Sequence, residues 1–472
     1  MAVAVPVVVG VVLGAARWSG RAPFGSDNDE YRLLADSLWR GSIEIAGVEG
    51  TKYPLGYSAV LGAVDRLGLP PTGAALVANV VLVVVLGVLV WRLVPTRAGT
   101  VGASVATTVL VASVSLWSSA VVTMPDLAFV VVVTAVVTVV GRLEARRDVV
   151  VLVVLVAAAV ALKSVGVLVG LAAAVALVRQ PAWRRWAWVP AAVGVGSAGL
   201  QAAWAGTAPE HTTGYARTFW LVDPFDAAAG RQGPLDLPGR VVERADVFLG
   251  DVAEAVVGPQ HTGVWTVLVA VALVAVAMVA WRHRLAFTVP FVALYAVFLA
   301  AWPYSSARFG LVLLPWAAVG AGVVVGEVAR RWHPAPAVAL AALVLVPYVV
   351  DARSDADRRA GVETAQVDAL EAGIADADRW LDDHVAPGEG VASLDYRELA
   401  YRTDRTYLPV PYTSDPAALW SATVGSGARW LVALGGLYPQ RQGVVEHLRA
   451  GHPDQVSVAA TFGPVTVYRL DP

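Results

Sequence analysis

The sequence contains no cysteine and only two lysines, Lys52 and Lys163, among its 472 residues. Without cysteine the chain can form no disulfide, no thiol nucleophile and no cysteine-ligated metal centre. Charged residues are also scarce, at 15% of the chain, whereas soluble domains average about 25%. The formal net charge of −2 argues against nucleic-acid binding, which requires a basic face.

Apolar sequence is abundant instead. Hydrophobic residues make up 57% of the chain and the mean hydropathy is +0.63, which is typical of a membrane protein. Since a spanning helix needs about 20 apolar residues, the apolar runs predict about eleven transmembrane helices. The predicted spans are 2–18, 72–94, 99–121, 124–141, 148–162, 164–178, 186–205, 263–281, 285–302, 308–329 and 335–350. Residues 2–18 are interpreted as a span rather than a cleaved signal, because no Lys or Arg precedes the apolar run.

The connections between these spans predict the topology. Five of them are short and basic, and the positive-inside rule places them in the cytoplasm: 91–97, 142–148, 179–185, 281–284 and 330–333. The chain is therefore predicted to be a multi-pass protein of the plasma membrane, with its N-terminus in the cytoplasm and its C-terminus outside. Nearly all of the unusual polar residues then fall on the outer side.

One apolar stretch, 148–178, is interrupted only by Lys163 and Ser164. A single helix over this stretch would leave its two basic flanks on opposite sides of the membrane. Two short helices that turn at Lys163 keep both flanks inside and place Lys163 at the outer face, although each helix would be only about 22 Å long. We therefore predict two helices here.

Residues 352–472 differ in character from the rest. An acidic segment with helical periodicity is followed by short apolar runs that alternate with helix-like segments, which predicts a small extracytoplasmic α/β domain. Residues 1–351 are predicted to form the transmembrane domain, with external loops at 19–71 and 206–262. No glycine-rich phosphate-binding fingerprint occurs in the C-terminal domain.

The first external loop begins with the acidic stretch "FGSDNDEYRLLADSLWRG", residues 24–41, whose apolar residues recur at helical spacing. It is followed by "TKYPLGY", "TMPDLAF", "ALKSVGVLVGL" and "SARFGLVLLPWAA". In their order and sidedness these stretches resemble the GT-C glycosyltransferases, the polyprenyl-phosphate-sugar-dependent enzymes that include the aminoarabinose transferases and protein O-mannosyltransferases. The resemblance implies a GT-C-like helical membrane fold.

The resemblance also implies an active site. Alignment on Tyr31 places the family's catalytic Asp at Asp27, with Asn28 where the family often has Glu. Asp27 would then be the general base that takes the proton of the attacking acceptor in an inverting transfer. Asp29 is the alternative base, since it lies two residues from Asp27, at a position where the family usually has no acidic residue.

The leaving phosphate needs cations, and three are candidates: Lys52, Lys163 and Arg308. A cation that interrupts an apolar run is costly and usually functional, which favours Lys163. Lys52 and Arg308 could instead be interfacial anchors. Further candidates for substrate or acceptor contact are Glu30, Tyr31, Tyr57, Asp126, Glu210 and His211.

Three questions stay open at this level. No cofactor is assigned, and a divalent metal could be held if Asp27 or Asp29 converged with Asp126. The predicted partners are a polyprenyl-phosphate-linked sugar, membrane lipids and a lipid, glycan or protein acceptor, without nucleic acid. The alternatives to a glycosyltransferase are a transporter or flippase of a lipid-linked glycan intermediate, or a non-catalytic protein with the same fold. Against a transporter, the midplane is almost pure Ala, Val and Leu and no repeat is evident.

Overall fold

The structure of the chain is a computed structural model. It describes residues 26–46, 48–49, 53–205, 218–224, 226–258, 263–282, 286–332, 335–346, 364–403, 405–410, 413, 415–435 and 439–472. The chain divides into two units. The helical unit contains 53–204 and 237–356, and the α/β unit contains 24–52, 205–236 and 357–472.

Apolar helices make up the helical unit. The described helices are α3 (Leu55–Arg66), α4 (Pro71–Leu93), α5 (Gly99–Ala112), α6 (Val114–Ala120), α7 (Asp126–Val140), α8 (Arg146–Leu162), α9 (Val167–Val178), α10 (Trp188–Ala205), α12 (Leu237–Glu243), α13 (Ala245–Val257), α14 (Val264–Arg282), α15 (Thr288–Ala301), α16 (Ala307–Gly310), α17 (Leu314–Arg331) and a helix over Ala335–Val346. A helix lies at each predicted span from 72–94 onward, whereas 2–18 falls outside the described residues.

Span length varies within this set. Among the described residues, Pro71–Leu93 and Ala307–Arg331 are each long and apolar enough to cross a membrane. The pair Thr96–Ala112 and Val114–Ala120 would make a third span with a 55° bend. Ser113 forms that bend, and its hydroxyl accepts a hydrogen bond from the backbone N–H of Leu116. The predicted number of eleven spans stays a prediction.

The core of the helical unit contains very close helix contacts. A Cβ atom added at Gly322 on α17 would lie 2.3 Å from the carbonyl oxygen of Gly102 on α5, and one at Gly326 would lie 2.3 Å from that of Ala98. Only glycine permits backbones to approach this closely, as is common between membrane helices. Any larger residue at Gly322 or Gly326 would push α17 away from α5.

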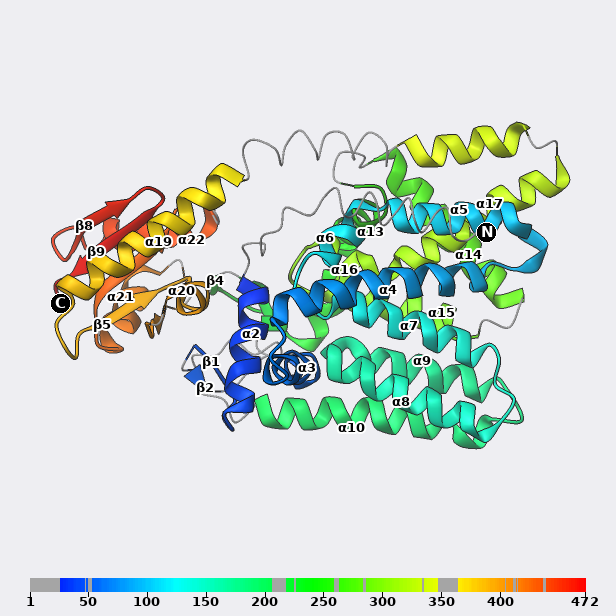
Figure 1. Ribbon diagram of the computed structural model, residues 1–472, viewed down its shortest axis with the longest axis horizontal. Helices are drawn as coiled ribbons and strands as arrows, with labels where there is room; N and C mark the ends of the chain where they lie inside the picture. Colours follow the sequence, from blue (N-terminus) through cyan, green and yellow to red (C-terminus); the bar gives the residue numbers. More distant parts are fainter. Residues whose placement is uncertain are drawn as a thin grey trace. The chain divides into compact units, whose positions relative to one another are not determined.

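The hairpin predicted at Lys163 is confirmed. Helix α8 ends at Leu162, a short 3₁₀ turn covers Ser164–Gly166, and α9 runs back along α8. A Cβ at Gly166 would lie 2.4 Å from the backbone of Ala159, and the two helices lie side by side in Figure 1. Lys163 itself is extended, with φ −145° and ψ 138°, at the tip of the hairpin.

The α/β unit is built around a five-stranded sheet (Figure 1). Its strands are β5 (Gly390–Ser393), β6 (Leu408–Pro409), β7 (Ala428–Leu434), β8 (Val456–Phe462) and β9 (Val465–Leu470), in the spatial order β6-β5-β7-β9-β8. The neighbours β6, β5 and β7 are parallel, while β9 is antiparallel to both β7 and β8.

Helices cover both faces of this sheet. Apolar residues of α19 (Thr364–His384) and α20 (Tyr396–Arg402) form one core with the sheet, and those of α21 (Pro416–Gly425) and α22 (Pro439–Gly451) form another. The predicted C-terminal α/β domain is thus present, as a three-layer sandwich. The same unit includes the acidic helix α2 (Ser26–Trp39) and two hairpins: β1 (Glu44–Ile45) with β2 (Val48–Glu49), and β3 (Leu221–Asp223) with β4 (Asp226–Arg231).

Candidate active site

Three charged side chains meet in the helical unit. The Nζ atom of Lys163 lies 2.7 Å from Oδ1 of Asp126 and donates a hydrogen bond to it. The Nε atom of Arg308 lies 3.8 Å from the same oxygen. These residues are far apart in sequence, and the sequence analysis predicted each of them as a site residue on the outer side.

Local sequence explains why all three stand at helix ends. Asp126 is the first residue of α7, after Pro125, and carries its negative charge where the helix dipole favours it. Lys163 occupies the α8–α9 turn. Arg308 follows Ser306, whose hydroxyl caps α16 by accepting from the Arg308 backbone N–H. The three polar residues therefore lie where helices begin or end, and the interiors of these helices stay apolar.

Burial differs between the acid and the two cations. The side chain of Asp126 is 5% exposed, whereas those of Lys163 and Arg308 are 15% and 29% exposed. Arg308 also donates to the sulfur of Met124, and Lys163 lies 5.5 Å from the ring centre of Phe309. One carboxylate thus lies close to two cations that remain partly exposed.

The charge balance of this group, which we call the cation cluster (Asp126, Lys163 and Arg308), is net positive. It suits an anionic ligand such as a phosphate, because charge-assisted hydrogen bonds to Lys and Arg are strong. It does not suit a divalent metal, since Lys163 and Arg308 would repel one. Within the described ranges, no three Asp, Glu or His side chains form a group that could hold a metal ion.

The acidic residues of the first loop lie on α2, in the α/β unit. Asp27 is half-buried in the first turn, whereas Asp29 and Glu30 are almost completely buried. Glu30 accepts a hydrogen bond of 2.7 Å from Nη1 of Arg397. The nearest guanidinium nitrogen of Arg402 lies 3.7 Å from Oδ2 of Asp29. Both arginines belong to α20.

Burial also sets the protonation of Asp29. It raises the pKa of Asp29 to about 7, although the nearby Arg402 and Arg32 oppose this increase. A general base must reach the acceptor proton, and the enclosed carboxyl group of Asp29 is less accessible than that of Asp27. The two predicted base candidates therefore stand in different environments.

Comparison with solved structures relates this arrangement to known proteins. ArnT from Cupriavidus metallidurans bound to undecaprenyl phosphate has a TM-score of 0.59 at 14% identity, with 99% of this chain and 97% of that chain covered. The archaeal oligosaccharyltransferase AglB from Archaeoglobus fulgidus, in complex with an inhibitory peptide and a dolichol-phosphate, has a TM-score of 0.56 at 12% identity, over 91% and 69% of the two chains. The chain has the GT-C fold. No protein-family model and no curated protein sequence matches it.

The remaining predicted residues have varied places in the chain. Tyr31 is buried on α2, and Tyr57 is buried on α3. Lys52, Glu210 and His211 lie outside the described residues. The structure thus brings together one predicted set, the cation cluster, and shows Glu30 and Asp29 joined to residues that were not predicted.

Arg397 and Arg402 on α20 were missed by the sequence analysis. The segment "YRELAYR" carries a visible signal, two arginines and two tyrosines in one short helix. Nothing in a single sequence links it to an acidic helix that lies more than 360 residues away. A basic, aromatic helix in an otherwise acidic domain could have been flagged as a partner for the acidic stretch.

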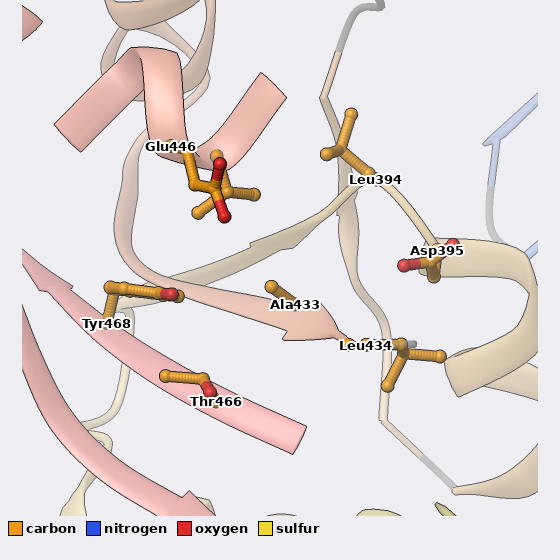
Figure 2. A pocket seen from close by; sticks show the side chains of 9 residues that line it. Leu394, Asp395, Ala433, Leu434, Glu446, Thr466 and Tyr468 are labelled. Carbon is orange, nitrogen blue, oxygen red and sulfur yellow. The ribbon is translucent and has the colours of Figure 1, made fainter. Parts of the chain in front are cut away.

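A small cavity of about 70 Å³ lies in the α/β unit. Figure 2 shows that Leu394 and Asp395, after β5, and Ala433 and Leu434, at the end of β7, line it. The carboxyl ends of neighbouring parallel strands form the usual crevice of an α/β sheet. Its lining contains no Lys or Arg, so the cavity does not suit a phosphate.

Proposed function

We propose that this protein is an integral membrane glycosyltransferase that moves a sugar from a polyprenyl-phosphate donor to an acceptor. The GT-C fold supports this proposal, since the similar structures of ArnT and AglB hold undecaprenyl phosphate and a dolichol-phosphate, respectively. The acceptor is a lipid, a glycan or a protein, and it reacts at the outer face of the membrane. The sugar is a hexose or a pentose.

The observation that carries the proposal is the cation cluster. Lys163 and Arg308 both lie close to the buried Asp126 and remain partly exposed, so both side chains can contact a ligand. Transfer breaks the bond between the anomeric carbon and the phosphate oxygen, and negative charge grows on the departing polyprenyl phosphate. Two cations fixed in advance stabilise that charge without reorganisation. The predicted third cation, Lys52, belongs to the same proposal.

Asp27 is the proposed general base. The acceptor oxygen attacks the anomeric carbon from the side opposite the phosphate, which inverts the configuration, and Asp27 takes the acceptor proton. Among the carboxylates of the first turns of α2, Asp29 and Glu30 lie buried against arginines of α20, whereas Asp27 is half-buried. That difference favours Asp27 over Asp29.

The topology completes the proposal. The N-terminus lies in the cytoplasm, about eleven helices span the plasma membrane, and residues 352–472 lie outside. The loops 19–71 and 206–262 are external as well, and parts of both belong to the same unit as the C-terminal domain. Within these loops, Glu210 and His211 are candidates for acceptor contact, as are Tyr57 and Tyr31.

A deletion strain tests the function directly. We expect it to accumulate a polyprenyl-phosphate sugar and to lack one envelope glycan or glycolipid that its parent makes. Expression of the intact chain should reverse both changes. Accumulation of an unflipped precursor at the cytoplasmic face would instead identify a flippase, and an unchanged set of lipid-linked sugars would contradict the proposal.

A further inference from the structure

The α2 helix and the α20 helix are joined by reciprocal polar contacts within the α/β unit. The acids Asp29 and Glu30 on α2 meet the arginines Arg402 and Arg397 on α20. In the opposite direction, Arg32 of α2 donates to the hydroxyl of Tyr401, and its guanidinium lies 5.0 Å from that ring centre. Polar side chains of each helix thus contact polar side chains of the other.

These contacts are enclosed rather than superficial. The side chains of Asp29 and Glu30 are 1% exposed, and those of Arg397 and Arg402 are 20% and 14% exposed. The Glu30–Arg397 ion pair costs desolvation, and loss of Arg397 would leave the charge of Glu30 buried. Arg402 also lies 3.8 Å from Glu371 of α19, which ties the contact to the body of the C-terminal domain.

The position of Asp27 depends on this anchorage through helix geometry. Residues three and four apart lie on the same side of an α-helix, so Asp27 shares a side with Glu30 and Tyr31. Glu30 is held by Arg397, a residue 367 positions further along the chain. A shift or rotation of α2 that breaks this hydrogen bond must move Asp27 with it.

We propose that Arg397 and Arg402 are positioning residues for sugar transfer: by holding Glu30 and Asp29 they fix the location of Asp27, so that the C-terminal domain controls turnover. This inference rests on the proposed function. The arginines touch neither donor nor acceptor, and they act through α2. Because these arginines act on the proposed base and not on the cations proposed to bind the donor phosphate, their loss lowers kcat and leaves the donor KM nearly unchanged.

The kinetic test uses the full-length chain in lipid nanodiscs with its native polyprenyl-phosphate sugar. Since a displacement of about 1 Å at a reacting group can cost about 100-fold in rate, we expect Arg397→Ala to lower kcat about 10- to 100-fold, with the donor KM within about 2-fold. Arg397→Lys should recover most of the loss. The exchange Glu30→Arg with Arg397→Glu should be more active than either single variant.

Arg405→Ala is the matched control. Arg405 belongs to the same domain and pairs with two carboxylates, Asp378 and Asp382, both on α19. Its loss removes two more exposed ion pairs of the same domain without touching α2, so kcat should stay within about 2-fold of the parent. An equal loss of kcat in Arg405→Ala and Arg397→Ala would overturn the inference, because general weakening of the domain would then explain both.

A structural readout separates this inference from the proposed function. The absence of cysteine allows spin labels to be placed cleanly at Asp36→Cys on α2 and Ala375→Cys on α19, two exposed positions. Arg397→Ala should broaden the measured distance distribution, and Arg405→Ala should not. An unchanged distribution in Arg397→Ala would overturn the anchorage. A broadened distribution with full kcat would overturn the positioning role alone. No transfer by the parent chain would refute the proposed function, whatever the labels show.

Discussion

The cation cluster of the helical unit and the α2–α20 contact of the α/β unit use the same chemistry to different ends. In the cation cluster one buried acid serves two cations, and both cations remain partly exposed. At the α2–α20 contact two acids face two arginines, and the acids are enclosed. Partly exposed cations gathered at one acid suit an anionic ligand, whereas enclosed acids that face arginines hold elements together. The ratio of charges and their exposure separate a binding site from a structural contact.

A large effect is expected from removal of a cation of the cation cluster. Lys163→Gln reduces the net charge of the cation cluster from +1 to 0 and removes one of the cations proposed to stabilise the leaving phosphate. We expect kcat/KM for the polyprenyl-phosphate sugar to fall by about 100- to 1,000-fold, as measured by transfer assays in nanodiscs. Arg92→Gln, at the exposed end of α4, is the matched control and should change kcat/KM by less than about 2-fold. Equal activity of Lys163→Gln and the parent would show that the cation cluster does not bind the donor.

The smaller expected effect concerns the α2–α20 contact and depends on pH. Because burial raises the pKa of Asp29 to about 7, the folded α/β unit retains a proton that the unfolded chain, with a pKa near 3.8, releases. Stability from this group is complete below about pH 4 and is lost as pH rises through about 7. One pKa unit corresponds to about 1.4 kcal/mol, so the whole change is at most about 4 kcal/mol.

Asp29→Asn should therefore flatten the decline of the melting temperature between about pH 4 and pH 7. Asn cannot ionise, so the pH-dependent contribution of Asp29 to stability is absent from this variant. Thermal melts of both proteins across this range measure the slope, and Asp36→Asn, an exposed acid on the same helix, should keep the parental slope. An identical slope in Asp29→Asn and the parent would show that Asp29 does not carry the effect.

The sequence predicted the helical unit well, for physical reasons. A lysine in an apolar run is expensive, so Lys163 had to mark a helix end, and the hairpin of α8 and α9 confirms it. The positive-inside rule put Asp126, Lys163 and Arg308 on one side of the membrane, and they meet in the structure. The predicted topology indicated that the three residues lie on the same side of the membrane. Only the structure shows that both cations lie close to one carboxylate.

The α/β unit was less accessible to sequence reasoning. Alternating apolar runs and helix-like segments predicted its class, but strand order and the pairing of α2 with α20 come from long-range packing. Glu30 was predicted as a substrate or acceptor contact, and the structure shows it bound to Arg397. No local pattern connects these two residues, because neither the periodicity nor the turn signals of one segment depend on the other.

The central claim is that Asp27 differs in kind from the other carboxylates of α2. The most direct measurement compares the rate of sugar transfer by Asp27→Asn and Asp36→Asn, in the same membranes with the native donor lipid. Both variants remove one charge from one helix. Since a general base contributes about 100- to 10,000-fold, we predict a loss of at least 100-fold in Asp27→Asn and the parental rate in Asp36→Asn. Full activity of Asp27→Asn would contradict the account.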